Sequence, residues 1–330
     1  MMKMLVPLAA VIVLIIIALA GVEATGMQAL FGIAIPYIAL IVFVVGMIYR
    51  VMDWAKSPVP FKIPTTCGQQ QSLPWIKQGK IENPSTCFHT FIRMALEVFL
   101  FRSLFRNLKT EMKDGKVVYG SDKWLWLFAL IFHYSFLVVL LRHIRFFVLE
   151  VPFVIEIIEA LDSFFQVGVP LLYITGVSLL AGALFLFIRR IAIPQVRYIS
   201  LPADYFPLFM IIAIAITGIL MRYFIKVDVV AVKNLTIGLV TFNPTVPEGI
   251  GSIFYVHLFL VCVLFAYFPF SKLVHMGGVF LSPTRNLAND SRMVRHINPW
   301  NYPVHVHTYE EYEDEFRDKM KKAGIPVEKE

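Results

Sequence analysis

Cysteine is scarce in this sequence. The chain of 330 residues has three cysteines, Cys67, Cys87 and Cys262, and they are widely separated. Their number and spacing exclude a disulfide framework and a CxxC metal site. They also argue against an iron–sulfur cluster held by this chain alone, because such a cluster needs about four thiolates.

Charge is scarce as well. Only 16% of the residues are charged and 58% are hydrophobic, whereas soluble domains carry roughly 25% charge. The apolar residues form blocks long enough for membrane-spanning helices, which need about 20 residues. Long alternating stretches, which would indicate a membrane β-barrel, are absent. The sequence therefore predicts an all-α fold, a polytopic bundle of transmembrane helices.

The net charge of +7 raises the question of nucleic acid or anionic lipid as a partner. The positions of the basic residues in the sequence support neither partner, because these residues gather in the connections between the apolar blocks. We expect no nucleic-acid partner, and we expect the lipid bilayer itself to surround the apolar blocks.

The sequence contains six candidate spans: Met4–Gly21, Ala24–Tyr49, Trp124–Phe147, Ser163–Ile188, Tyr205–Met221 and Gly249–Ser271. The first has features of a signal peptide, since Lys3 precedes an apolar run that small residues follow. We expect it to be retained as a transmembrane helix. Its removal would leave five spans in the same orientation.

Lysine and arginine in the loops predict the orientation of the chain. They follow the second span, precede the third, separate the fourth from the fifth and follow the sixth, whereas the opposite loops are acidic or balanced. These residues are Arg50, Lys56, Lys62, Lys109, Lys113, Lys116, Lys123, Arg189, Arg190, Arg197, Lys272, Arg285, Arg292 and Arg295. We expect a multi-pass protein of the cell (cytoplasmic) membrane with both termini in the cytoplasm.

The chain then divides into four parts: two transmembrane helices in 1–52, a cytoplasmic connection in 53–122, a four-helix core in 123–275 and a cytoplasmic tail in 276–330. The connection contains an amphipathic, helix-like run from Phe88 to Leu108. This run either lies on an anionic membrane surface or a partner, or packs on loops of the protein itself. In the tail, the charge pattern from Tyr309 to Ala323 predicts a solvated helix that docks a cytoplasmic partner.

Four of the eight histidines lie in or at the ends of two spans. His133 and His143 belong to the third span, and His257 and His275 lie on or just past the sixth. Imidazole in a bilayer is costly and usually marks function. A single histidine could instead bond a neighbouring helix, but two on each of two helices are harder to explain in that way.

The antiparallel course of these spans places His143 near His257 on the outer side and His133 near His275 on the inner side. Haem iron with two axial imidazoles needs one histidine on each side of the haem, and two neighbouring helices can provide one each. Two pairs predict two haem groups stacked across the membrane. They would be haem b, because the sequence has no CxxCH motif for covalent c-type haem.

The spacings of the histidines differ. Ten residues of helix rise about 15 Å and 18 residues about 27 Å. The mismatch predicts tilted haems or helices, or an interruption before His275, which Pro269 could supply.

Three basic residues adjoin the histidines. Arg142 and Arg145 flank His143, and Lys272 lies one turn before His275. They either hold haem propionates as charge-assisted partners or anchor the helix ends at the membrane interface.

The histidine spacings and the run from Phe268 to His275, FPFSKLVH, resemble the gamma subunit of respiratory nitrate reductase. The resemblance covers the third to sixth spans. It implies that His143 and His257 are the iron ligands of the outer haem, and that His133 and His275 are those of the inner haem. The extra first span, the long connection and the tail depart from that family.

The tail motifs NPWNYP and VHTYEEYE are similar to a narrower group, the DsrM-type cytochrome b subunits of the membrane complex linked to dissimilatory sulfite reduction. That resemblance extends over the whole chain. It implies menaquinone as the substrate, a cytoplasmic iron–sulfur subunit resembling heterodisulfide reductase, and further membrane and extracytoplasmic subunits in one complex.

By resemblance to the gamma subunits, quinol reacts near His143. Arg145, Glu150, Glu156 and Glu159 are then candidates for the release of its protons, although most acidic residues in such a loop are merely solvated.

Other histidines are weaker candidates for a metal. His89, beside Cys87, is expected to make a structural or partner contact. His305 and His307 alternate like neighbours on a strand, but no third ligand is evident near them in the sequence.

The main hypothesis is an electron-transfer subunit of a quinol-linked oxidoreductase without a catalytic side chain of its own. Quinol would be oxidised near the outer face, with electrons passing through two haems to the cytoplasmic side, and the reverse flow, quinone reduction, is a variant. The same residues would serve a gamma-type cytochrome b of another respiratory complex. A proton-coupled transporter lacks support from inverted repeats, and a haem-free membrane anchor leaves the histidines unexplained.

Overall fold

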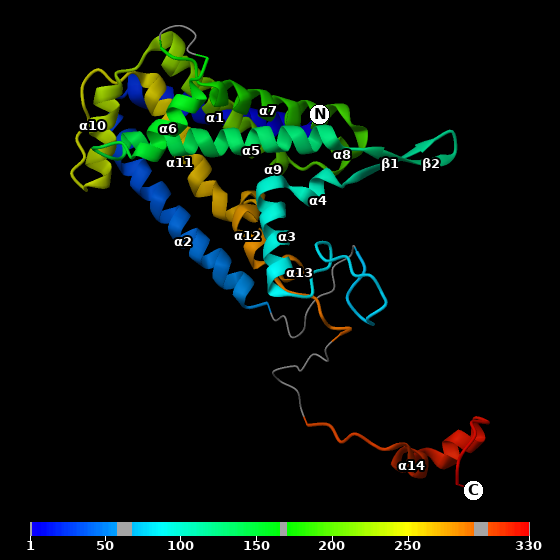
Figure 1. The fold of residues 1–330 in the computed structure, drawn as a ribbon. Helices are drawn as coiled ribbons and strands as arrows, with labels where there is room; N and C mark the ends of the chain where they lie inside the picture. Colours follow the sequence, from blue (N-terminus) through cyan, green and yellow to red (C-terminus); the bar gives the residue numbers. More distant parts are fainter. Residues whose placement is uncertain (1, 58–67, 166–169, 294–302, 330) are drawn as a thin grey trace.

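The computed structural model describes residues 2–57, 68–165, 170–293 and 303–329, and it is mainly helical (Figure 1). Six helices in this part are long and apolar enough to cross a membrane. They are α1 (Met2–Glu23), η1 with α2 (Leu30–Ala34, Ile35–Ala55), α5 with η2 (Lys123–His143, Ile144–Phe146), α7 (Ile174–Ala192), α9 with η3 (Pro202–Leu220, Met221–Ile225) and α11 with η4 (Ser252–Tyr267, Phe268–Phe270). The predicted polytopic helical bundle with six spans is confirmed.

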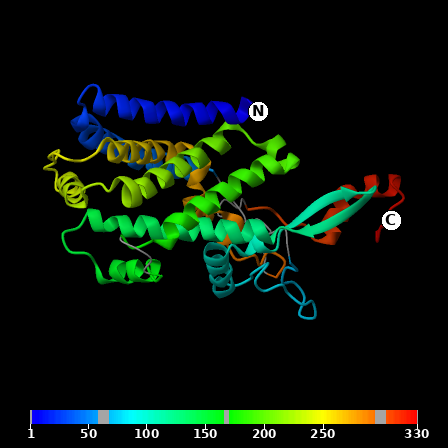
Figure 2. The same ribbon diagram turned by 90° about the horizontal axis from the view of Figure 1, so that it is seen from above.

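The helices pack in a row in which α1 contacts α9 and α11, α9 contacts α7, and α7 contacts α5 (Figure 2). The second span, α2, leans on α11. At the centre of the bundle Met210, Leu235, Tyr255 and Leu260 are fully buried. Many other large apolar side chains on the spans are exposed, as expected for helices that face lipid.

The two ends of the bundle differ. At one end, called the basic end here, Lys3 Nζ donates to the Tyr198 carbonyl (3.3 Å), and Arg189 pairs with Asp122 (2.8 Å). These contacts join the N-terminus of α1, the start of α5 and the connection from α7 to α9, so the segments predicted to share one side of the membrane do lie together. The opposite end, the far end, carries α6 (Phe153–Asp162) and α10 (Val229–Val240).

The fourth span is shorter than predicted. It was expected to begin at Ser163, but helix α7 begins at Ile174. Residues 163–165 form a turn after α6, and Pro170 and Leu171 form another. Pro170 lies inside the apolar run, and proline in a helix interior removes a backbone hydrogen bond, so a continuous helix from Ser163 to Ile188 is disfavoured.

The connection at the basic end contains α3 (Cys87–Leu100), α4 (Arg102–Phe105) and an antiparallel hairpin of β1 (Leu108–Lys113) and β2 (Lys116–Ser121). The helix expected from Phe88 to Leu108 therefore ends eight residues early. The hairpin turns at Asp114 and Gly115, whose φ values are 52° and 73°. Positive φ at both central residues is typical of the type I′ turn, which joins two strands through a two-residue loop.

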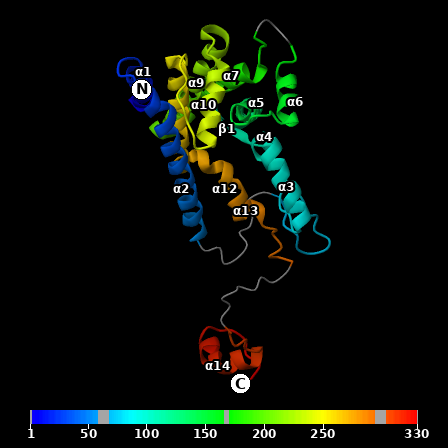
Figure 3. The same cartoon turned by 90° about the vertical axis from the view of Figure 1, so that its left-hand side faces the viewer.

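The tail is tied to the connection before it leaves the bundle. Helices α12 (His275–Leu281) and α13 (Pro283–Asn286) lie between α2 and α3 (Figure 3). Beyond them, buried Asn289 donates through its backbone N–H to the Pro84 carbonyl (2.6 Å) and through its amide to Asn83 (2.8 Å). The connection and the first part of the tail thus form one packed unit.

The predicted tail helix is confirmed as α14 (Tyr309–Lys322), which begins with a capping box between Thr308 and Glu311. Hydrogen bonds from the backbone N–H groups of Glu328 and Lys329 (2.7 and 2.9 Å) hold the pKa of the Glu313 carboxyl below its usual range. These contacts fold the last residues back onto α14.

A close contact between α5 and α7 predicts a stability effect. At Gly182 an added Cβ would lie 3.1 Å from Phe132 Cβ and 3.2 Å from its Cα, whereas at Gly176 on the same helix it would meet nothing within 4 Å. We expect Gly182→Leu to cost about 1–3 kcal/mol, because the two helices must separate. Thermal unfolding in one detergent measures this. Equal midpoints for Gly182→Leu and Gly176→Leu would contradict it.

Candidate haem site

The structure brings the four histidines together in the expected pairs. His143, the last residue of α5, faces His257 of α11, with ring centroids 6.3 Å apart and ring planes at 14°. His133 of α5 faces His275, the first residue of α12, with centroids 6.1 Å apart and planes at 84°. The first pair lies toward the far end and the second toward the basic end.

These distances suit one metal ion between the two rings of each pair. A metal lies about 2 Å from a coordinating imidazole nitrogen, and the ring centre lies roughly 1 Å behind that nitrogen. Two axial imidazoles on one haem iron therefore have ring centres about 6 Å apart. Both pairs meet this requirement, so the residues present fit a bis-histidine haem at each position.

Hydrogen bonds orient all four rings. Nδ1 lies 2.7 Å from the Ala129 carbonyl in His133, 2.7 Å from the Val139 carbonyl in His143 and 2.8 Å from the Lys272 carbonyl in His275. In His257 the partner is the Thr217 hydroxyl at 2.9 Å. A ligating histidine typically donates its second N–H in this way, which leaves Nε2 for the metal. Thr217 was not identified from the sequence, because its role depends on the packing of α9 against α11.

The interruption expected before His275 is confirmed. Helix α11 ends at Tyr267, the one-turn 3₁₀ helices η4 (Phe268–Phe270) and η5 (Lys272–Val274) follow, and Ser271 between them is extended. Helix α2 supports the bend, since Arg50 Nε donates to the Pro269 carbonyl (3.0 Å) and a Cβ on Gly46 would lie 2.8 Å from Pro269 Cβ. This local rearrangement replaces the regular helix between Tyr267 and His275 and brings His275 opposite His133.

The three basic residues next to the histidines all have carboxylate partners. Arg142 pairs with Asp162 (2.9 Å), Arg145 with Glu159, and Lys272 with Asp204 (2.7 Å). A propionate would have to share each cation with these carboxylates. Their role as propionate partners stays a prediction.

The far end beside His143 contains a cluster that the sequence did not single out. Asp162, at the end of α6, is buried and accepts hydrogen bonds from the backbone N–H and the hydroxyl of Thr175 (2.8 and 2.6 Å). The guanidinium groups of Arg142 and Arg222 lie 3.6 and 3.9 Å from the centre of the Tyr173 ring. Of the acidic residues expected here, Glu150 and Glu156 are exposed, and Glu159 pairs with Arg145.

Three further histidines in the described part of the chain, His89, His305 and His307, lie outside this site. His89 contacts the Thr86 hydroxyl through Nδ1 (2.8 Å), which confirms the expected structural contact at the start of α3. The sequence did not point to a third ligand for His305 and His307, but α14 brings Glu311 to them, with candidate ligand atoms within 4.8 Å of one another. All three are exposed, as solvated surface groups are. Cys87 is exposed and Cys262 is buried, while Cys67 lies outside the described residues.

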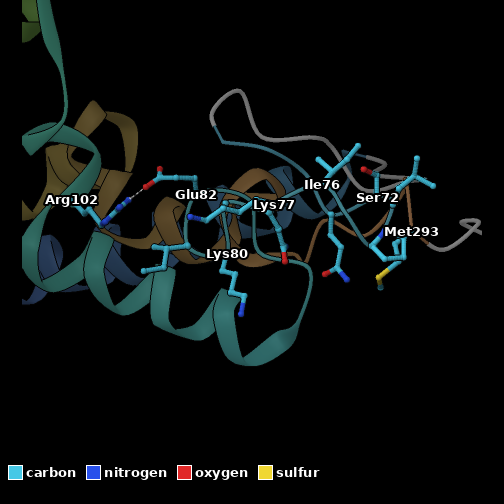
Figure 4. Close-up of a pocket in the computed structure, with 13 residues that line it drawn as sticks. Ser72, Ile76, Lys77, Lys80, Glu82, Arg102 and Met293 are labelled. Atoms are coloured by element: carbon cyan, nitrogen blue, oxygen red, sulfur yellow. Dashed lines mark ion pairs between the residues drawn. The ribbon is translucent and has the colours of Figure 1, made fainter.

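An open recess of about 930 Å³ lies between the connection and the first part of the tail. It is lined by residues 71–74 and 76–82 with Arg102 and Met293, and the ion pair of Arg102 with Glu82 closes one side (Figure 4). None of the four paired histidines lines it.

Comparison with known proteins agrees with this geometry. Residues 85–296 match the nitrate reductase gamma subunit family, and this region includes all four paired histidines. An Archaeoglobus fulgidus protein described as an Hdr-like menaquinol oxidoreductase cytochrome b-like subunit is 48% identical over 279 residues, which cover 82% of this chain and 83% of the relative. Its counterpart in Archaeoglobus profundus is 47% identical over 276 residues, with 81% and 82% covered.

The resemblance to the nitrate reductase gamma subunits is thereby confirmed, while neither relative is described as a DsrM-type subunit. The matched region begins just before α3 and ends in the tail, so it contains the connection from residue 85 onward, the core and the bend at Pro269. The chain is a multi-pass, cytochrome b-like membrane protein that belongs to the nitrate reductase gamma subunit family.

Proposed function

We propose that this chain is the di-haem b subunit of a menaquinol oxidoreductase, and that it oxidises menaquinol near the far end and delivers electrons at the basic end. The observation that carries the proposal is the pair of ring separations, 6.1 and 6.3 Å, together with the engaged Nδ1 atoms of all four histidines. The names of the two archaeal relatives support menaquinol as the substrate.

When bound, two haem b groups supply one-electron carriers at the two positions. The protein's part is to hold His143 and His257 nearly parallel, and His133 and His275 nearly perpendicular. In this proposal Arg142, Arg145 and Lys272 also contact the propionates, by sharing charge-assisted hydrogen bonds with their carboxylate partners.

The far end offers groups that can accept the protons of a quinol. In our proposal Glu159, paired with Arg145, takes the two protons of a quinol bound near His143 one after the other, as its two electrons leave, and exposed Glu150 and Glu156 pass them to water. Oxidation at this end with delivery at the other would separate charge across the membrane. We place the far end outside and the basic end in the cytoplasm, because the loops of the basic end carry the lysine and arginine excess.

The partner in this proposal is a cytoplasmic iron–sulfur subunit that resembles heterodisulfide reductase. Its support is the Hdr-like description of the relatives and the tail motifs that resemble the DsrM-type subunits. Helix α14 would dock this subunit, since it is solvated and carries charges of both signs. By the same resemblance we propose a link to dissimilatory sulfite reduction.

Anaerobic addition of a water-soluble menaquinol analogue to the purified, haem-loaded chain tests the proposal. We expect the b-type absorption bands of the reduced protein to develop, and Glu159→Gln to slow their development while haem content stays unchanged. A protein that dithionite reduces fully but the quinol analogue does not reduce would contradict the quinol-oxidising role. Haem binding itself would then stand.

A further inference from the structure

We propose that Phe101, at the corner between α3 and α4, is a positioning residue that fixes the ring of His133 and thereby tunes the iron site nearer the basic end. This inference rests on the proposed function, since it assumes that His133 and His275 bind haem iron.

The backbone of Phe101 is strained. It has φ 48° and ψ 46°, a left-handed conformation that bulky side chains rarely adopt and that glycine or asparagine adopts readily. Such residues persist where the surrounding structure over-determines them, and they cluster at functional sites. A helix terminus alone would not require phenylalanine here.

Helix α5 holds the corner in this conformation. The carbonyls of Phe99 and Leu100 accept hydrogen bonds from the Tyr134 hydroxyl (2.8 Å) and from Trp126 Nε1 (2.7 Å). The last carbonyls of a helix have no partner within the helix, so these two side chains satisfy them and fasten the end of α3 to α5. The second contact is reinforced by Phe105, whose ring lies edge-on to Trp126 with centroids 4.8 Å apart.

The strain directs the Phe101 ring onto His133. The two ring centroids lie 5.0 Å apart with planes at 86°, an edge-on aromatic contact. His133 is also held by the Ala129 carbonyl at Nδ1 and faces His275. Phe101 thus supplies a contact from outside α5 that restricts rotation of the imidazole about its hydrogen bond.

The contact is specific to one of the two histidine pairs. The orientation of His257 depends on Thr217 of α9, and His143 contacts Phe146 of its own span. The corner therefore acts on one iron site only. Any displacement of α3, which lies in the connection, is transmitted to His133 through the two hydrogen bonds and the Phe101 ring.

The test replaces Phe101 by asparagine, which tolerates the left-handed backbone but removes the ring. The matched control is Phe91→Ala, which removes an exposed ring of α3 ten residues before Phe101. Redox titration and electron paramagnetic resonance of the haem-loaded chain report each haem separately. We expect Phe101→Asn to shift the midpoint potential and the largest g value of one haem, to leave the other unchanged, and to be rescued in Phe101→Tyr.

Unchanged signals of both haems in Phe101→Asn would overturn the proposal, as would equal shifts of both haems or the same shift in Phe91→Ala. A Trp126→Phe variant gives a second measurement, because it removes the bond to the Leu100 carbonyl and leaves Phe101 in place. It should shift the same haem by a smaller amount, and a shift of the other haem would count against the proposal. A wild-type chain that binds no haem would instead refute the proposed function.

Discussion

Asp162→Ala is expected to destabilise the protein by about 3–5 kcal/mol, because it leaves the Arg142 charge without its partner in a buried position. The side chains of Arg142 and Asp162 are only 10% and 2% exposed, and their atoms approach to 2.9 Å. The substitution also removes both hydrogen bonds to Thr175 at the start of α7. These contacts join α5, α6 and α7 next to His143.

A neighbouring ion pair provides the control. Glu159 lies on the same helix and pairs with Arg145, whose side chain is 35% exposed. Partly exposed pairs contribute less than about 1 kcal/mol, so Glu159→Ala should change the thermal midpoint little. Thermal unfolding of both variants in one detergent makes the comparison. If the thermal midpoints of Asp162→Ala and Glu159→Ala are equally close to that of the wild type, the buried ion pair does not stabilise this end of the bundle.

The second large effect is spectroscopic. The haem-loaded chain is expected to give two distinct low-spin ferric signals, because the axial rings are nearly parallel in one pair (14°) and nearly perpendicular in the other (84°). Parallel imidazoles split the two iron d orbitals with which they interact, whereas perpendicular imidazoles leave them almost equal in energy. Axial ligands are a main means by which a protein tunes haem iron.

Electron paramagnetic resonance of the oxidised protein distinguishes these cases. We expect one ordinary rhombic signal and one strongly anisotropic signal with a larger maximum g value. The anisotropic signal should disappear in His133→Ala, and the rhombic signal should disappear in His257→Ala. Two identical signals, or loss of the rhombic signal in His133→Ala, would contradict the ring geometry.

The sequence predicted the features that depend on local composition. Apolar blocks of sufficient length predicted the six spans, since length and hydropathy alone decide whether a helix can cross a bilayer. The antiparallel course of two spans then predicted which histidines lie near each other, and both pairs are found at about 6 Å. Pro269 predicted the break before His275, because proline disrupts the helical hydrogen bonds.

The sequence did not predict features that depend on tertiary contacts. Helices α6 and α10 are apolar but only 10 and 12 residues long, so no span-length criterion finds them. The early end of α3 at Phe101 depends on side chains of α5, which lie 25 and 33 residues further along the chain. In the sequence, Asp162 cannot be distinguished from other acidic loop residues. Its role depends on the packing of α6, which places it against Arg142 and Thr175.

The most direct measurement is a pyridine haemochrome assay with haem quantified per chain. We predict two b-type haems in the wild-type chain and one in either His257→Ala or His143→Ala, with two retained in His89→Ala, whose ring contacts Thr86 and Phe88. One haem should also remain in His133→Ala. A folded wild-type chain without haem, or His257→Ala with both haems, would contradict the paired histidine sites.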